Sequence, residues 1–182
     1  MSELFISGLH HSTATVEIGD EQLKAEQSLS ITTGITYQNQ WLHADVNLYS
    51  HLFKNYIYGK PDTQPILTIR GYFPVLRYVQ TDAAISGSDI NLAVFPIRQL
   101  ELSAKASLLW AVNLKTKDWL EQMPSQRFNY SIRYTINGTK DFSNLYLALS
   151  VVHVLRQNLL PKNYADYLPA PKAYWLLNFD CG

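Results

Sequence analysis

Residues 100–114, LELSAKASLLWAVNL, alternate between apolar and polar side chains along most of their length. Apolar residues occupy the even positions from Leu100 to Leu114, and the polar residues fall on odd positions: Glu101, Ser103, Lys105, Ser107 and Asn113. A period of two residues predicts a β-strand with one apolar and one polar face. The alternation is about three times as long as the ~5–6 residues of a typical strand in a soluble sheet. The stretch therefore predicts one unusually long strand.

The same pattern predicts further strands over residues 28–37, 41–49, 75–94, 128–136, 145–155 and 173–179. Tight connections are expected at residues 38–40, 96–99 and 137–141, the last marked by the turn signal Asn137-Gly138. Long connections are expected at residues 59–74, 116–126 and 157–172. Because short and long connections alternate, all tight turns fall at one end of an antiparallel meander. The sequence therefore predicts an all-β, up-and-down meander of about seven long strands.

One predicted strand changes its parity along its length. Ile90, Leu92 and Val94 are even, whereas the apolar residues upstream, Val75, Val79 and Ile85, are odd. A β-bulge near Gly87 would explain the change, because one extra residue turns every later side chain to the other face. Alternatively, the upstream part extends beyond the apolar layer, where parity is not enforced. We favour the second explanation.

Composition excludes several classes of protein. Fifteen Lys and Arg residues balance fifteen Asp and Glu residues, so no attraction to nucleic acid is predicted. The single cysteine, Cys181, excludes a disulfide framework. The longest apolar run, Leu108 to Val112, is far shorter than the ~18 residues of a membrane-spanning helix, but a membrane β-barrel needs no such run. No secretory signal follows Met1, so we expect a cytoplasmic protein or an internal piece of a longer chain.

Charged residues indicate which environment each face of the strands contacts. Those within the alternating stretches all have the polar parity: Asp45, Asp89, Glu101, Lys105, Arg133 and Arg156. A cationic side chain facing lipid at the bilayer midplane costs ~2–4 kcal/mol, whereas one facing a water-filled lumen costs little. The pattern predicts an apolar face against lipid and a polar face around a lumen. His153 breaks it and is interpreted as an interfacial residue; the alternative is a large soluble sheet with one wet face.

Several segments resemble the barrel portion of TonB-dependent outer-membrane receptors. They are residues 2–20, Leu23-Lys24-Ala25-Glu26-Gln27-Ser28, Asn55-Tyr56-Ile57-Tyr58, Tyr78-Val79-Gln80-Thr81-Asp82-Ala83 followed by Gly87, and Met123-Pro124-Ser125-Gln126-Arg127. The resemblance implies a barrel of about 22 strands around a plug domain. About seven strands fall below the ~8 of the smallest barrels, so this chain is expected to be a partial transmembrane β-barrel that cannot close alone. Within residues 1–182, residues 1–27 are expected to be an extracellular loop segment, and residues 28–182 to be strands with short periplasmic turns and long extracellular loops.

The resemblance also implies a function. We expect a receptor in the outer membrane of a Gram-negative bacterium, in contact with its lipid, that imports an iron chelate, haem or a metal ion. TonB would supply the energy through the plug, which is absent from this chain. The alternative is a soluble all-β ligand-binding protein.

Two histidines form a candidate metal or haem site. His10 and His11 lie near Glu17 and Asp20, and imidazole and carboxylate groups can hold zinc, while imidazole can ligate haem iron. Adjacent histidines on a strand point to opposite faces, so at most one would reach a given site there. The alternative is that both are solvated loop residues.

A second candidate site follows from the longest predicted loop. Arg70, Tyr72, Phe73 and Arg77 occupy or border it, and their guanidinium and aromatic groups can bind an aromatic or anionic iron chelate. The alternative is a loop packed on its neighbours. No catalytic set is predicted, because Ser150 and His153 have opposite parity and face opposite sides of a strand. We expect no enzyme activity and no bound cofactor.

Overall fold

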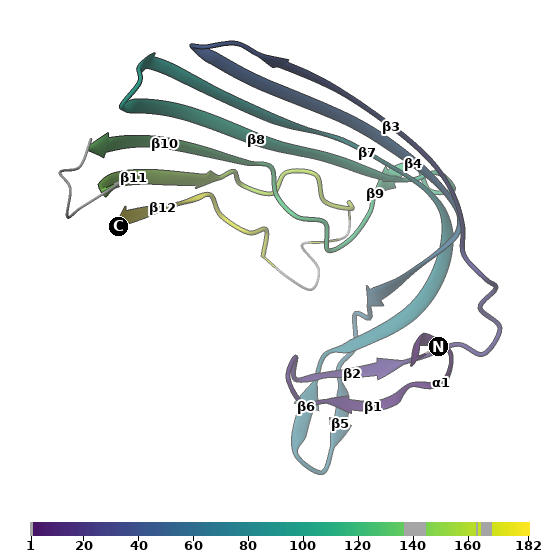
Figure 1. The fold of residues 1–182 in the computed structure, drawn as a ribbon. Coiled ribbons are helices and arrows are strands. Elements are labelled where there is room, and N and C mark those ends of the chain that lie inside the picture. Colours follow the sequence, from purple (N-terminus) through teal and green to yellow (C-terminus); the bar gives the residue numbers. More distant parts are fainter. Residues whose placement is uncertain (1, 137–144, 163, 165–168) are drawn as a thin grey trace.

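The computed structural model describes residues 2–136, 145–162, 164 and 169–182. Its seven long strands pair antiparallel in chain order: β3 (Gln27–Gln38), β4 (Leu42–Pro61), β7 (Val75–Ile97), β8 (Leu100–Asn113), β10 (Arg127–Ile136), β11 (Leu145–Val154) and β12 (Tyr174–Cys181). The predicted all-β meander is confirmed. Figure 1 shows that the strands form one curved, open sheet, and that β4 and β7 continue beyond β8 and bend away from it.

Pairing registers bring most apolar residues of the alternating stretches in the seven strands to one face. Directly paired residues point to the same side of a sheet. One continuous row of paired residues crosses the sheet and consists of Ile35, Val46, Ile90, Ala106, Phe128, His153 and Trp175. We call this face the outer face and the opposite one the inner face. The predicted separation of apolar and polar residues between two faces is confirmed.

The outer face has no second layer above it among the described residues. Leu29, Ile31 and Ile35 of β3 are 63%, 67% and 73% exposed, and Leu102, Tyr130, Leu149 and Leu177 continue the exposed apolar surface across the sheet. A soluble sheet would bury such a face against helices or a second sheet. The exposed apolar area is instead what a partial transmembrane barrel presents to lipid.

Tight turns join the strands at one end of the sheet. Between β3 and β4, the Asn39 side-chain oxygen accepts hydrogen bonds from the backbone nitrogens of Trp41 (2.9 Å) and Leu42 (2.8 Å). Arg98 and Gln99 alone separate β7 from β8. The turn predicted at residues 137–141 lies outside the described residues. The long connections lie at the other end of the sheet. For the connections that the structure describes, the predicted separation of tight turns and long loops between the two ends is therefore confirmed.

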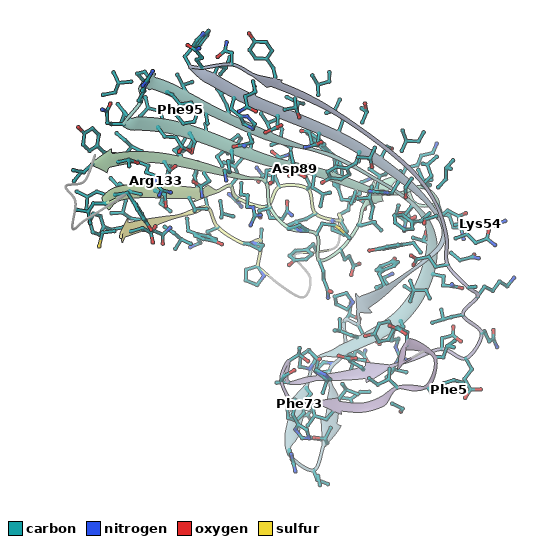
Figure 2. The ribbon with its side chains drawn as sticks, in the orientation of Figure 1. Phe5, Lys54, Phe73, Asp89, Phe95 and Arg133 are labelled. Atoms are coloured by element: carbon teal, nitrogen blue, oxygen red, sulfur yellow. The ribbon has the colours of Figure 1, made fainter. Side chains whose placement is uncertain are left out.

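The change of parity in β7 is not caused by a bulge near Gly87. Pairing passes through Gly87 without a shift in both neighbouring ladders, so the upstream half of β7 extends beyond the apolar band, as favoured above. A bulge occurs in β4 instead, where the register shifts between Phe53 and Tyr56. Asn55 adopts φ 59° there, a left-handed conformation that asparagine tolerates better than most residues. Lys54 projects at this bend (Figure 2).

Short elements accompany the extended ends of β4 and β7. β1 (Ser7–His10) and β2 (Thr15–Ile18) form a hairpin, and β2 pairs parallel with the first residues of β7. β5 (Ile66–Thr68) and β6 (Gly71–Phe73) form a second hairpin. β9 (Asp118–Trp119) pairs with the end of β8, and α1 (Ser2–Phe5) precedes β1. In the part of the chain that the structure describes, no helix is long and apolar enough to cross a membrane.

Candidate functional site

The side chain of Gln80 fixes the bulge of β4 at the point where the strand leaves the apolar band. The side-chain amide of Gln80 pairs with both backbone groups of Lys24: the Lys24 nitrogen donates to Gln80 Oε1 (2.8 Å), and Gln80 Nε2 donates to the Lys24 oxygen. Gln80 Nε2 also donates to the carbonyl oxygen of Asn55 (3.1 Å). The glutamine side chain thus replaces a missing backbone partner for two segments.

Two carboxylates bind further backbone groups of β4 at and beside the bulge. The Glu26 Oε2 atom accepts a hydrogen bond from the backbone nitrogen of Ile57 (3.1 Å), and Asp82 Oδ1 accepts one from that of Asn55 (3.2 Å). The Asn55 nitrogen lies within the bulge, and Ile57 lies beyond Lys54, the last residue of β4 that pairs with β3. Three of the segments that carried the family resemblance, residues 23–28, 55–58 and 78–83, therefore meet in space and hold the extended strands in place.

Residues 114–126 fold back onto the inner face instead of projecting from the end of the sheet. Leu120 is 2% exposed and packs with Ala83 and Ala111, and Phe53 and Met123 lie against this cluster. The Leu120 nitrogen donates to the Ala111 oxygen (2.9 Å). Burial of these apolar groups stabilises the inward position of the loop.

Asn113 connects this loop to the wall. Its Oδ1 atom accepts hydrogen bonds from Thr81 Oγ1 (2.7 Å) and from the backbone nitrogens of Lys115 (3.0 Å) and Thr116 (3.2 Å). Its side chain is also hydrogen-bonded to Tyr58. Burial is the main reason that the pKa of Tyr58 is raised, the negative charge of Glu121 raises it further, and the bond from Asn113 opposes both.

A cavity of about 370 Å³ lies between the extended end of β4, the loop after β8 and the loop after β11. Its lining includes Tyr58, Lys60, Asn113, Asp118, Trp119 and Lys162. The backbone nitrogen of Lys162 donates to Asp118 Oδ2 (3.1 Å), which joins the two loops across the cavity. The cavity combines two aromatic rings, two ammonium groups and two carboxylates, those of Asp118 and Glu121. Its volume lies within the ~300–1,000 Å³ typical of small-ligand sites.

A row of aromatic rings on the inner face of β4 leads to this cavity. Consecutive ring centroids from Tyr49 through His51, Phe53 and Tyr56 to Tyr58 lie 5.5, 6.2, 5.2 and 6.2 Å apart. The sequence reasoning missed both the row and the cavity. The signal for the row was present as aromatic residues at every second position, but the bulge interrupts that spacing after Phe53.

Comparison of the sequence with known protein families agrees with this fold. The domain described as "TonB dependent receptor-like, beta-barrel" matches residues 1–180. The chain belongs to this family. The predicted resemblance is therefore confirmed, and the family consists of receptors and transporters rather than enzymes. No curated protein matches the sequence.

Solved structures of TonB-dependent receptors share this fold. The copper transporter OprC superposes with a TM-score of 0.71 at 14% identity, covering 87% of this chain and 23% of its own. A mutant of the ferric enterobactin receptor PfeA from Pseudomonas aeruginosa gives 0.62 at 20% identity, covering 91% and 24%. The siderophore receptor PirA from Acinetobacter baumannii gives 0.60 at 16% identity, covering 92% and 27%. The chain thus spans about a quarter of the length of these receptors.

The predicted histidine site is only partly assembled in this TonB-dependent receptor chain. His10 Nδ1 lies 3.1 Å from Thr13 Oγ1 and 3.9 Å from Glu17 Oε1, whereas His11 lies in the turn after β1. No group of three or more His, Cys, Asp and Glu residues that could hold a metal ion occurs in the described ranges. The role of His10 and His11 stays a prediction.

The four residues of the second predicted site lie in two places. Arg70, Tyr72 and Phe73 belong to the β5–β6 hairpin, and Tyr72 is 71% exposed. Arg77 lies on β7, where its Nε atom donates to Asp62 Oδ2 (2.7 Å) and holds the pKa of Asp62 below its usual range. The lining of the 370 Å³ cavity includes none of the four. Figure 2 shows Phe73 well apart from the part of the sheet that carries Asp89 and Arg133. The role of Arg70, Tyr72, Phe73 and Arg77 in binding also stays a prediction.

Replacement of Asn113 by leucine is expected to release residues 114–126 from the wall. The substitution leaves Thr81 and two backbone nitrogens without their acceptor, a loss of about 1–3 kcal/mol for a buried network. Trp119 should then become more accessible to iodide, measured as the part of the fluorescence quenching that disappears when Trp119 is replaced by phenylalanine. The matched substitution Asn178→Leu on β12 should leave the quenching unchanged. Equal quenching in both variants would show that Asn113 does not hold the loop.

Proposed function

We propose that this chain forms part of an outer-membrane receptor that takes up a scarce nutrient from outside a Gram-negative bacterium. The observation that carries the proposal is the cavity at the extended end of the sheet, where two long connections close over the end of β4. Family membership and the exposed apolar outer face support a place in the outer membrane. The opposite end has tight turns, which suits the periplasmic side.

The cavity suits a metal chelate with aromatic or anionic groups. Tyr58 and Trp119 offer ring faces for stacking, and Lys60 and Lys162 offer positive charge. The solved relatives are a copper transporter, a ferric enterobactin receptor and a siderophore receptor. An iron chelate is therefore our first candidate, and haem and a metal ion are the alternatives that the binding experiment compares.

TonB is the proposed source of energy for the transport step. Membership in a family of TonB-dependent receptors supports this part of the proposal. TonB would act through a plug domain, which is not part of the described residues. Uptake of the bound ligand by cells that express the full reading frame should stop when TonB is deleted, while surface binding of the ligand continues. Uptake that persists without TonB would contradict this step.

Titration of the protein encoded by the full reading frame with ferric enterobactin, haem and Cu²⁺ tests the ligand. Ferric enterobactin should bind best, and Trp119→Ala should weaken its binding by about tenfold or more if the ring stacks on the ligand. The control variant Trp41→Ala removes an exposed tryptophan beside the tight turn between β3 and β4 and should not change affinity. Equal affinities for both variants would remove the cavity from the binding site.

A further inference from the structure

A second cavity, of about 230 Å³, lies on the inner face between β8 and β10 and is lined by Lys105, Ser107, Arg127, Asn129 and Val152. Ser107 pairs directly with Arg127, and Lys105 pairs directly with Asn129. Four polar side chains therefore project from adjoining positions of two neighbouring strands. The lining of this cavity shares no residue with that of the 370 Å³ cavity.

This second cavity carries two positive charges and no lining carboxylate. Asp45 shares the row of Lys105 across the sheet, but its carboxylate accepts hydrogen bonds from Thr36 and Asn91 and contacts His43. Asp89 pairs with Ser107 from the β7 side, which makes it a diagonal neighbour of Lys105 and places it two strands, or roughly 10 Å, from Arg127. Asp89 therefore lies as near to Lys105 as Arg127 does, but neither acid lines the cavity, and Arg127 is paired with the uncharged residues Ser107 and Val154.

Lys105 and Arg127 are diagonal neighbours across the β8–β10 ladder. Like charges in such positions repel each other across roughly 7–8 Å. In the part of the chain that the structure describes, no hydrogen bond or ion pair engages the side chains of Lys105, Ser107, Arg127 or Asn129. A bound anion would relieve the repulsion and supply acceptors for the guanidinium, ammonium, amide and hydroxyl donors at once.

We propose that this cavity is an anion-binding site on the inner wall, taking a carboxylate or phosphate group. Arg127 presents a planar fork that matches the two oxygens of such a group, and Lys105 adds a point charge from the neighbouring strand. Ser107 and Asn129 supply neutral donors beside them. This goes beyond the proposed receptor function, because it assigns a second site below the ligand cavity.

Two sources can supply the anionic group, and citrate distinguishes them. A carboxylate of a free solute would leave the site open to citrate, whereas a carboxylate from another segment of the same polypeptide would exclude it. In the first case, calorimetry on the protein encoded by the full reading frame should detect citrate binding that weakens as salt rises. In the second case, citrate should not bind, and loss of the two cations should lower the melting temperature.

The decisive comparison uses the double variant Lys105→Gln with Arg127→Gln. It should weaken citrate binding by about tenfold or more, since charge-assisted hydrogen bonds are lost, or lower the melting temperature if an internal carboxylate fills the site. The control, Arg98→Gln with Lys117→Gln, removes the same two kinds of charge from exposed connections and should do neither. The charge-preserving exchange Lys105→Arg with Arg127→Lys should retain most of the citrate affinity or thermal stability.

Two results would overturn the anion site. One is citrate binding that is equal in the wild-type protein and in the double glutamine variant. The other is an absence of citrate binding together with equal melting temperatures of the double variant and the Arg98–Lys117 control. Neither result bears on ferric enterobactin binding at the 370 Å³ cavity, so failure of this proposal and failure of the proposed function can be told apart.

Discussion

Arginine in place of Ala104 is expected to destabilise the folded protein in a lipid bilayer by about 2–4 kcal/mol, the cost of a cationic side chain on the lipid face near the midplane. Ala104 lies on the outer face, between Leu92 of β7 and Tyr130 of β10. It is well inside β8 and away from both ends of the strand. Urea unfolding of the protein encoded by the full reading frame in phosphatidylcholine vesicles measures the loss.

The neighbouring residue provides the matched control. Ser103 precedes Ala104 on the same strand but lies on the inner face, where its hydroxyl group is hydrogen-bonded to Ser131 (2.7 Å). Ser103→Arg places the same charge at nearly the same depth in the membrane but toward water, and should cost about 1 kcal/mol or less. A similar loss of stability for both variants would mean that the outer face does not contact acyl chains.

The sequence was sufficient for the long strands and their two faces. The period of two along β8 and β10 is enforced by lipid on one side and water on the other, so the polarity of each residue indicates the face on which it lies. The registers then pair Leu102 with Ile132 and Glu101 with Arg133, as the separate parities require. Regular structure under such a two-sided constraint can be predicted from local pattern alone.

The extended end of the sheet could not be predicted in the same way. Beyond the membrane both faces of a strand meet water or protein, so parity carries little information. The bulge at Asn55 depends on Gln80 and Asp82 of another strand, and β1, β2, β5 and β6 are too short to show a period. Hairpin formation in those segments is decided by tertiary contacts.

The 370 Å³ cavity could not be predicted from the sequence for a related reason. It exists because Leu120 finds an apolar patch formed by Ala83 and Ala111, which lie far from each other in the chain. The fold-back of residues 114–126 is therefore a long-range packing event. The sequence suggested Arg70 and Tyr72 for ligand binding because they lie in the longest predicted loop, and their role stays a prediction. The cavity lies at another connection, residues 114–126, which packs inward.

Alanine in place of Gly87 is expected to destabilise the sheet by about 1–3 kcal/mol, the usual cost of forcing extra atoms into a packed site. A Cβ atom at this position would meet the hydroxyl group and ring of Tyr49 and the backbone oxygen of Leu108. The Leu108 oxygen belongs to the neighbouring strand and cannot rotate away. Gly87 therefore permits the close approach of β4, β7 and β8, with the Tyr49 ring lying over it.

Gly8 and Tyr49 supply the comparisons that test this explanation. A Cβ atom at Gly8 would meet nothing within 4 Å, so Gly8→Ala should leave the urea midpoint nearly unchanged. Tyr49→Ala removes the ring but not the Leu108 oxygen, so in a double-mutant cycle it should recover only part of the loss caused by Gly87→Ala. Full recovery would make the tyrosine the sole obstacle, and an unchanged midpoint for Gly87→Ala would show that the strands can separate at little cost. The expected partial recovery would show that backbone proximity, as well as aromatic packing, requires glycine at the centre of this wall.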